Sequence, residues 1–352
     1  MRERHSAALT VPTLLAAPDK FRGSATAPEV ATALAAAAEA AGWACVQLPL
    51  ADGGEGTLDA FGGANRTTTV TGPLGTPVDA PWRMGDDGVA VVESARASGL
   101  DLAGGAEGND PVGATSRGTG ELVAAAIAEG ARRVIVSLGG SATTDGGFAT
   151  VEELDASAPF DGRDGRPEVL VACDVRTTFR DAAVVFGPQK GASPEQIIEL
   201  TGRLDRLAAT YKQRYGIDLS AVDGSGAAGG LGGALAALGA RLVPGFGLIA
   251  EHTGLAEAIR SADAVVTGEG KLDAESFNGK VVGGVLELAA QHGVPALVVA
   301  GVVDDTANGL VHGRTTSVSL LDRYGSDASW GDPLGCVTQA AEQWLRREWA
   351  AQ

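Results

Sequence analysis

The sequence predicts an α/β fold in which a domain built on a parallel sheet is interrupted by a second, inserted α/β domain. At both ends of the chain, apolar runs typical of buried strands alternate with helical patterns, the order expected of parallel strands joined by helices. Between residues 67 and 93 the pattern changes to short β-branched runs separated by Gly-Pro and Asp-Asp-Gly turns, which indicates antiparallel strands. With 352 residues, the chain is long enough for two domains.

The two outer segments predict one five-stranded parallel sheet with right-handed crossovers. In the first segment, strands are expected at 13–17 and 44–50, with a helix at 28–41 between them that Gly42 ends. In the last segment, we expect strands at 264–267 and 296–300 and helices at 281–291 and 337–350. The middle predicts a helix at 121–129, strands at 134–138 and 168–173, and a long amphipathic helix at 194–215.

The composition and charge argue against several classes of protein. The 27 basic and 44 acidic residues give a formal charge of −17, which disfavours nucleic acid or an anionic membrane surface as partner. Cys45, Cys173 and Cys336 form no CxxC motif and the four histidines show no zinc spacing, so a reducing cytoplasm is expected. No apolar run approaches the roughly 20 residues of a membrane helix. Because Pro12 interrupts the apolar stretch near the start, a short disordered leader is favoured over a signal peptide.

The segment 268–280 is the most informative in the chain. It follows the expected strand at 264–267, precedes the helix at 281–291 and carries Glu269, Lys271, Asp273 and Lys280 among glycines. Junctions of this kind bind anions, because the helix presents free N–H groups there. Lysines beside carboxylates at such a point indicate phosphate with a divalent cation, and hence phosphoryl transfer.

Other glycine-rich segments carry polar side chains after expected strands. The 51 glycines are roughly twice the usual share of about 7%, and the excess clusters at 53–56, 139–147, 224–233 and 268–279, as turns beside strands would. Asp52 and Glu55 are candidates for a metal ligand or a base, although an ordinary surface turn is the alternative. The hydroxyls and N–H groups of 139–147 form a candidate anion site, and Asp145 could hold Mg²⁺ or accept a proton.

Three further segments pair charge with glycine. Lys190 lies between a Gly-Pro turn and a helix start, and it is either solvated or a phosphate ligand. Lys20 and Arg22 follow the first strand. Arg117 opens a helix, where it could bind an anion or a nearby carboxylate equally well.

Two nucleotide-binding motifs receive little support. Residues 224–229 fit GxGxxG, but no clear strand precedes them and Ile249 stands where a ribose-binding acid is expected. The GxxxxGK[ST] motif of P-loop enzymes is absent from the sequence.

In chain order, these segments resemble the glycerate kinase family of bacteria, whose members lack a P-loop. Nine blocks carry the resemblance, and they are 17–19, 51–57, 71–75, 116–122, 139–147, 172–175, 186–192, 227–233 and 268–280. The chain departs from the family in a shorter stretch at 148–172, in the sequence at 176–179, and in Lys20 and Arg22, where many members have Ser and Lys. The first two departures leave the choice of substrate open.

The resemblance implies ATP-dependent phosphorylation of D-glycerate to 2-phosphoglycerate or 3-phosphoglycerate, with ATP and Mg²⁺ as cofactors. It also implies a Rossmann-like domain interrupted by a second domain, with the active site in the cleft between them. The boundaries expected from the sequence are 1–63 and 232–352 for the Rossmann-like domain and 64–231 for the inserted one.

On this resemblance we expect the following site residues. Asp52 or Asp145 would accept the proton of the substrate hydroxyl, and Lys190 and Lys280 would bind the triphosphate or the transferred phosphoryl group. The substrate would contact Asp19, Lys20, Arg22, Ser116 and Arg117, since an arginine fork matches a carboxylate. Phosphate and nucleotide would contact Gly139, Gly140, Ser141, Thr143, Thr144, Gly268, Gly270, Lys271 and Ser276. Asp174, Glu269 and Asp273 would hold the metal ion.

Three alternatives remain open. The chain could phosphorylate another small hydroxy or sugar acid, or bind glycerate or nucleotide as a catalytically weak sensor, while a nicotinamide oxidoreductase is the least supported. The expected partners are glycerate and ATP, without nucleic acid or membrane, in a cytoplasmic protein for which a homodimer is compatible with the sequence.

Overall fold

The computed structural model describes residues 11–307 and 309–350, and most of the expected leader lies outside these residues. The chain forms two compact units. Unit 1 comprises Met1–Leu50 and Ala250–Gln352, and unit 2 comprises Ala51–Ile249. No helix in the described part of the chain is long and apolar enough to cross a membrane. The mixed α/β fold with parallel sheets is the one that the sequence predicts.

Unit 1 contains a five-stranded sheet in the order β11-β10-β9-β1-β2, with every neighbouring pair parallel. Its strands are β1 (Thr13–Ala16), β2 (Ala44–Gln47), β9 (Ala264–Leu272), β10 (Ala296–Val303) and β11 (Thr315–Ser319). Strand β11 is not among the strands expected from the sequence, because its Thr-Thr-Ser-Val-Ser sequence has no apolar run and lies half exposed at the sheet edge.

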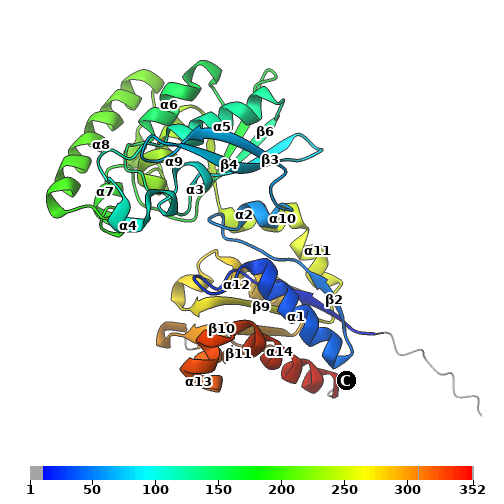
Figure 1. The fold of residues 1–352 in the computed structure, drawn as a ribbon. Helices are drawn as coiled ribbons and strands as arrows, with labels where there is room; N and C mark the ends of the chain where they lie inside the picture. The colour runs from blue at the N-terminus through cyan, green and yellow to red at the C-terminus, as the bar shows by residue number, and fades with distance from the viewer. Residues whose placement is uncertain (1–10, 308, 351–352) are drawn as a thin grey trace, which may run out of the picture. The chain divides into compact units, whose positions relative to one another are not determined.

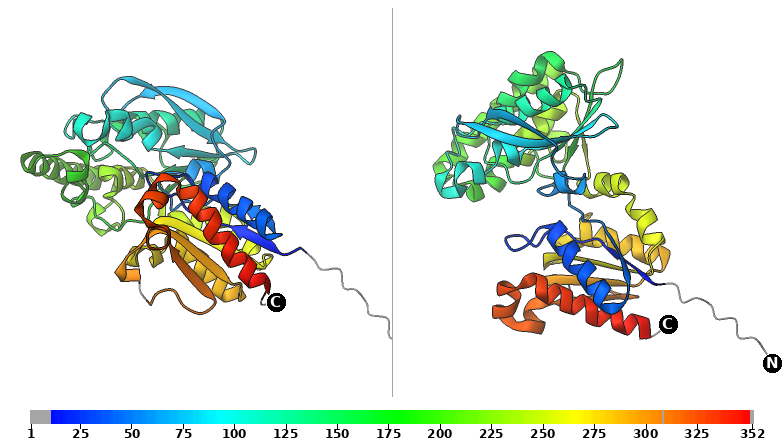
Figure 2. Two further views of the ribbon diagram at one scale, coloured as in Figure 1. Left: turned by 60° about the horizontal axis from the view of Figure 1, so that its bottom comes forward. Right: turned by 45° about the vertical axis from the view of Figure 1, so that its right-hand side comes forward.

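Helices cover both faces of this sheet. On one face, α1 (Ala27–Ala41) and α14 (Pro333–Ala350) pack side by side against alternate strand residues such as Leu297 and Val299 (Figures 1 and 2). On the other, α12 (Val281–His292) packs against Val298 and Ala300. The remaining helices are α10 (Gly245–Thr253), at whose middle the units divide, α11 (Leu255–Arg260) and α13 (Leu320–Gly331).

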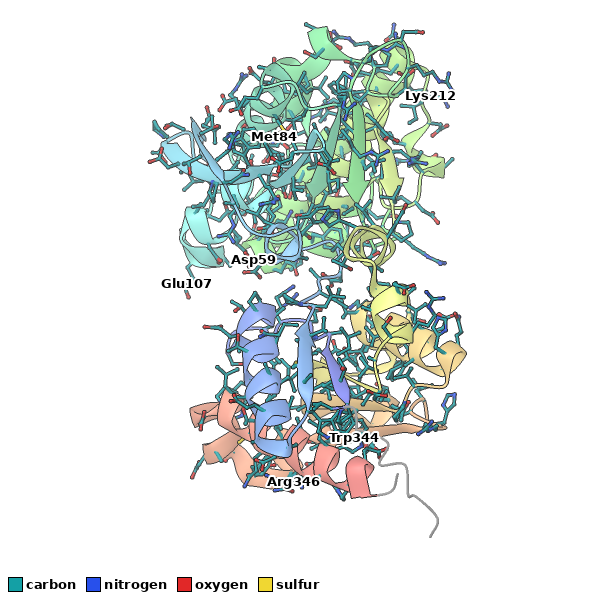
Figure 3. The ribbon with its side chains drawn as sticks, turned by 90° about the vertical axis from the view of Figure 1, so that its right-hand side faces the viewer. Asp59, Met84, Glu107, Lys212, Trp344 and Arg346 are labelled. Carbon is teal, nitrogen blue, oxygen red and sulfur yellow. The ribbon has the colours of Figure 1, made fainter. Side chains whose placement is uncertain are left out.

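The pairing of α1 and α14 shows how local signals and packing agree. Thr26 and Glu29 form a capping box at the start of α1, and Gly42 ends the helix at φ 79°. The side chain of Trp344 is buried in the unit 1 core, and the Arg346 guanidinium donates to the carbonyl of Ala40 at 2.6 Å (Figure 3 labels both). Sequence-distant ends of unit 1 are thereby joined.

Unit 2 contains a six-stranded sheet in the order β3-β4-β5-β6-β7-β8. The strands are β3 (Arg66–Thr71), β4 (Pro77–Met84), β5 (Val89–Glu93), β6 (Arg133–Ser137), β7 (Glu168–Ala172) and β8 (Arg241–Val243). The first two pairs are antiparallel, as the change in pattern at 67–93 predicts, and the pairs from β5 to β8 are parallel. The helices are α2 (Thr57–Ala60), α3 (Ala95–Ser98), α4 (Gly105–Gly108), α5 (Arg117–Ala128), α6 (Phe148–Leu154), α7 (Ala182–Phe186), α8 (Pro194–Tyr215) and α9 (Leu231–Ala237).

The structure divides the chain at 50/51 and 249/250, not at 63/64 and 231/232 as expected. The physical reason lies in packing within unit 2. A Cβ on Gly53 would lie 2.6 Å from Gly245 Cα, so these two segments are in direct contact. Helix α9 belongs to the unit 2 core through Leu231 and Leu235, and β8 pairs with β7.

Two element boundaries differ from expectation in ways that affect the site. Strand β9 continues to Leu272, so Glu269 and Lys271 lie in the strand and not in a loop. A 3₁₀ turn at Ala274–Phe277 then precedes α12. Helix α5 begins at Arg117, which is therefore its first helical residue.

Candidate active site

In unit 2 the loop 52–56 lies against the carboxyl ends of the parallel strands. A Cβ on Gly139, which follows β6, would approach Gly54 Cα to 2.9 Å, and one on Gly53 would lie 3.0 Å from the Cβ of Ala172, the last residue of β7. Only glycine permits these contacts, and Gly53 also has a φ of 87°. Ligands of open α/β sheets bind at this edge, so Asp52 lies where a substrate is expected.

Carboxylates at this edge are held by backbone N–H groups. Asp52 is partly buried, and its Oδ1 accepts from Gly54 N at 3.2 Å. Asp174, which follows β7, is exposed, and its Oδ1 accepts from Gly245 N at 2.8 Å. Because Gly245 contacts Gly53, the structure brings Asp52, Gly139 and Asp174 to one edge of unit 2.

Asp145 is buried and engaged on both oxygens. Its Oδ2 accepts from the backbone N–H and the hydroxyl of Ser116 at 2.9 and 2.8 Å, and its Oδ1 accepts from Gly147 N at 3.0 Å. The Ser116 hydroxyl also contacts Thr150 Oγ1 at 3.0 Å and is fully buried. Ser116 thus orients Asp145 and does not present its hydroxyl at the surface.

Lys190 lies beneath the loop 139–147. It ends the 3₁₀ turn Pro188–Lys190, and its Nζ donates to the carbonyl oxygen of Thr143 at 2.6 Å. Burial lowers the pKa of Lys190 to about 8, and the charge of Asp145 opposes that shift. The Thr143 hydroxyl contacts Ser141 Oγ at 3.0 Å, so cation and hydroxyls form one connected network.

Asn109, which no sequence pattern indicated, also belongs to this network. Its Nδ2 donates to the carbonyls of Ala142 (3.1 Å) and Lys190 (2.9 Å), joining the glycine-rich loop to the 3₁₀ turn. Asn109 Oδ1 and Thr144 Oγ1 are buried without a hydrogen-bond partner. Buried polar atoms usually have partners, so each of these atoms is an exception within the network.

Glu93 is another residue that no sequence pattern indicated. It ends β5 with only 1% of its surface exposed, and its carboxylate contacts the loop that follows Asp52. Nothing in its local sequence distinguishes it from an acid at the exposed end of a strand.

Arg117 is placed beside acids of α6. Its guanidinium contacts Glu153 at 2.8 Å and Glu152 at 3.0 Å. Of the two partners that the sequence left open, an anion or a neighbouring carboxylate, the structure shows carboxylates.

In unit 1, the segment after β1 lies against the second half of β9. The Asp19 N–H donates to the carbonyl of Gly268 at 2.9 Å, and a Cβ on Gly270 would lie 3.2 Å from Arg22 N. Lys20 lies next to Asp19 with a 4.0 Å ion pair, and Arg22 is exposed. These residues therefore lie just beyond the carboxyl end of β1 and beside the second half of β9.

Glu269 is the acid with the most perturbed pKa in this group. Burial raises its pKa to about 7, with Asp19 adding to the rise and the Ser276 hydroxyl and Lys280 opposing it. Its Oε1 is buried without a hydrogen-bond partner. A carboxylate that is desolvated and has a perturbed pKa is a candidate for binding a cation or for transferring a proton.

The other charged residues of 268–280 have local partners. Lys271 contacts Asp273 at 3.4 Å and Asp304 at 3.3 Å, which raises the pKa of Lys271. Asp273 also caps the 3₁₀ turn by accepting from Glu275 N. Lys280 precedes α12 and contacts the exposed Glu275 at 3.6 Å. In the part of the chain that the structure describes, no three Asp, Glu, His or Cys side chains are grouped to hold a metal ion.

Comparisons with known proteins agree with these features. The model of the "Glycerate kinase family" matches residues 14–167 and 158–347. A "Glycerate 2-kinase" of Escherichia coli (strain K12) is 39% identical over 349 residues, covering 89% of this chain and 91% of that protein. A "Glycerate kinase" of Halalkalibacterium halodurans is 35% identical over 352 residues, covering 88% and 91%.

A solved structure gives the same result for the fold. The crystal structure assigned as glycerate kinase 2 of Salmonella typhimurium LT2 has a TM-score of 0.77 and 32% identity, and the match covers 97% of this chain and 99% of that one. The resemblance drawn from the nine sequence blocks is confirmed, and with it the kinase and transferase class. The chain belongs to the glycerate kinase family.

Proposed function

We propose that this chain transfers the γ-phosphoryl group of ATP to a hydroxyl of D-glycerate, giving 2-phosphoglycerate, with 3-phosphoglycerate as the alternative product. The proposal rests mainly on one observation: Asp52 lies near Gly139 and Asp174 at the carboxyl ends of the parallel strands of unit 2. The 2-position is favoured because the Escherichia coli relative carries the name glycerate 2-kinase.

Asp52 is the better placed of the two proposed bases. Asp145 already accepts three hydrogen bonds, whereas Asp52 is partly exposed on a loop at the strand ends. In the proposed step, Asp52 accepts the hydroxyl proton while the substrate oxygen forms a bond to the γ-phosphorus. The bond from that phosphorus to the bridging oxygen breaks, and ADP leaves with the electron pair. Asp145 then serves to orient the loop 139–147.

The proposal gives the phosphates to backbone N–H and hydroxyl groups. Gly139, Gly140, Ser141, Thr143 and Thr144 supply donors after β6, and Lys190 adds positive charge from beneath the loop. Gly268, Gly270, Lys271, Ser276 and Lys280 supply the corresponding groups of unit 1.

The glycerate carboxylate is assigned to Lys20 and Arg22, with Asp19 available for a substrate hydroxyl. Arg22 is exposed, so its fork is accessible to a carboxylate. Arg117 remains a weaker candidate, because Glu152 and Glu153 already contact its guanidinium.

Mg²⁺ fits the residues proposed for it to different degrees. Glu269 fits best, since its buried Oε1 has no hydrogen-bond partner. Asp174 is exposed but accepts from Gly245, and Asp273 is engaged by Lys271 and by its capping role. When bound, the ion would neutralise phosphate charge. We propose Glu269 as its main protein ligand, with Asp174 and Asp273 as candidates for additional or water-mediated contacts.

The experiment that tests the function is product identification. The purified protein is incubated with ATP, Mg²⁺ and D-glycerate, and phosphorus and proton NMR identify the phosphoester. A 2-phosphoglycerate signal together with ADP supports the proposal, and a 3-phosphoglycerate signal corrects the position. Asp52→Asn is the matched control, because it removes the proposed base with little change in shape.

A panel of small hydroxy and sugar acids in an ADP-release assay tests the substrate. Faster turnover of another acid than of D-glycerate would replace the substrate in the proposal. Binding without ADP release for every acid would favour a sensor instead. We further propose that the enzyme works in the cytoplasm, where ATP is available; its three cysteines all carry free thiols.

A further inference from the structure

Glu93 makes three contacts from a buried position at the end of β5. Its Oε1 accepts from Gly56 N at 3.0 Å and from Leu58 N at 2.8 Å, and its Oε2 accepts from Arg96 Nε at 3.1 Å. The carboxyl side chain is 1% exposed, while that of Arg96 is 43% exposed. A carboxylate so deeply buried is tolerated only when hydrogen bonds compensate it, and here two of the three come from the loop segment.

The segment that Glu93 holds is rich in glycine and carries the proposed base. Gly53 and Gly56 have φ values of 87° and 93°, and the Thr57 hydroxyl donates to Gly54 O at 2.7 Å. Glycine residues allow many backbone conformations, so a loop rich in glycine is flexible unless other contacts fix it. Holding Asp52 at the carboxyl ends of the strands therefore requires contacts that fix the loop. Glu93 provides two of them, the hydrogen bonds from the N–H groups of Gly56 and Leu58.

We propose that Glu93 is a positioning residue, which holds the loop 52–58 so that Asp52 keeps its place at the carboxyl ends of the parallel strands. This inference rests on the proposed function, in which Asp52 acts on the substrate. Glu93 itself contacts backbone N–H groups and Arg96, and it does not act on the substrate directly.

The test compares Glu93→Gln with Glu121→Gln. Glu121 is a matched control, because its carboxylate also accepts a backbone N–H, that of Thr71 at 2.6 Å, together with the Thr71 hydroxyl. Glu93→Gln removes the negative charge, so the hydrogen bonds from the loop N–H groups become weaker. It also replaces one carboxylate oxygen with an N–H₂ group, so either the loop N–H groups or Arg96 lose their acceptor. Three properties are measured for each variant: kcat with the KM values for glycerate and ATP, the melting temperature, and hydrogen exchange at residues 52–58.

We expect Glu93→Gln to lower kcat on the order of tenfold through misplacement of Asp52, with KM for ATP unchanged. Exchange at Gly56 and Leu58 should accelerate by a similar factor, while the melting temperature changes as little as in Glu121→Gln. Unchanged kcat and unchanged exchange in a folded Glu93→Gln would overturn the inference. An equal loss in Glu121→Gln would do the same, because the effect would then be general.

Two further variants complete the design. Arg96→Ala keeps both loop contacts, so it should retain more activity than Glu93→Gln; equal losses would assign the effect to the ion pair and overturn the inference. Should Glu93→Gln not fold, Glu93→Asp decides by kcat and hydrogen exchange, since it keeps the charge but shortens the reach. Failure of both to fold would show a role in stability alone and would also overturn it.

The exchange readout separates this inference from the proposed function. A wild-type protein that releases no ADP with any acid contradicts the function. Faster exchange at 52–58 in Glu93→Gln would still show that Glu93 holds the loop.

Discussion

The ammonium nitrogen of Lys190 lies 2.6 Å from the carbonyl oxygen of Thr143, and the lysine is only 3% exposed. A buried ammonium group is costly unless hydrogen bonds and opposite charge compensate it. Thr143 supplies the hydrogen bond, and Asp145 supplies the charge. Lys190 therefore contacts the glycine-rich loop 139–147 from within unit 2, and in the proposed reaction its charge would act on a bound phosphate through that loop.

Lys190→Met should lower kcat by at least about tenfold, since it removes a preorganised positive charge beside the loop 139–147, which is proposed to bind phosphate. Methionine keeps much of the side-chain volume, and circular dichroism should show a folded protein. Lys212→Met is the control, because Lys212 is exposed on α8 and pairs only with Asp218 among the interactions that the structure describes. Equal kcat values for the two variants would contradict a role for Lys190 in the reaction.

The lowered pKa of Lys190 predicts how stability depends on pH. Burial lowers this pKa from 10.5 to about 8 in the folded protein, so between these values the unfolded chain binds a proton that the folded protein does not. Stability then increases with pH over that window. Relative to Lys190→Met, the wild-type free energy of unfolding should rise by at most about 3 kcal/mol from pH 8 to pH 10.5.

Urea unfolding of both proteins at several pH values measures this difference. A difference that stays constant, or that falls with pH, would show that Lys190 is not held in a desolvating environment. Since the reaction is proposed to use the charged lysine, kcat should fall above pH 8 in the wild-type enzyme as well.

Asn109→Ala should loosen the loop 139–147, because the Asn109 amide joins the carbonyls of Ala142 and Lys190. We expect a loss of about 1–2 kcal/mol in stability and a fall in kcat. Asn65→Ala is the control, since the Asn65 side chain also makes two hydrogen bonds to backbone, both to Met84, the last residue of β4. If both variants lose stability equally and only Asn109→Ala has a lower kcat, Asn109 contributes to the active site. Equal kcat values in the two variants would show that Asn109 contributes only to the stability of the fold.

The sequence predicted the elements whose signals are local. Helix α8 begins and ends where expected, because Ser193 caps its start and Gly216 ends it in the left-handed conformation. Gly56, which donates to Glu93, lies 37 residues from it in the chain, and Lys190, whose carbonyl accepts from Asn109, lies 81 residues from that residue, so no local pattern could indicate these two contacts. Arg117 shows the same limit, since only the fold could decide between an anion and the acids of α6. Local chemistry thus identified the loops, and long-range packing determined which side chains are accessible.

Lys280→Ala should cut kcat by on the order of 100-fold while leaving the fold intact, if Lys280 contacts the transferred phosphoryl group as proposed. Its contact with the exposed Glu275 is 3.6 Å long, and exposed pairs of this kind contribute little to stability. Arg260→Ala is the unit 1 control, because Arg260 is exposed and pairs with Glu257 in the same helix. Near-normal kcat in Lys280→Ala would remove Lys280 from the site.

Glu269→Gln tests the proposed metal ligand by stability as well as by activity. Burial raises the pKa of Glu269 from 4.5 to about 7, so between these values the folded protein binds a proton that the unfolded chain does not. Relative to Glu269→Gln, the free energy of unfolding of the wild-type protein should therefore fall as the pH rises from 4.5 to 7. Added Mg²⁺ should restore stability to the wild-type protein above pH 7 by neutralising the buried carboxylate. Thermal unfolding at pH 8 with and without Mg²⁺ measures the effect, and an equal shift in Glu269→Gln would show that the ion binds elsewhere.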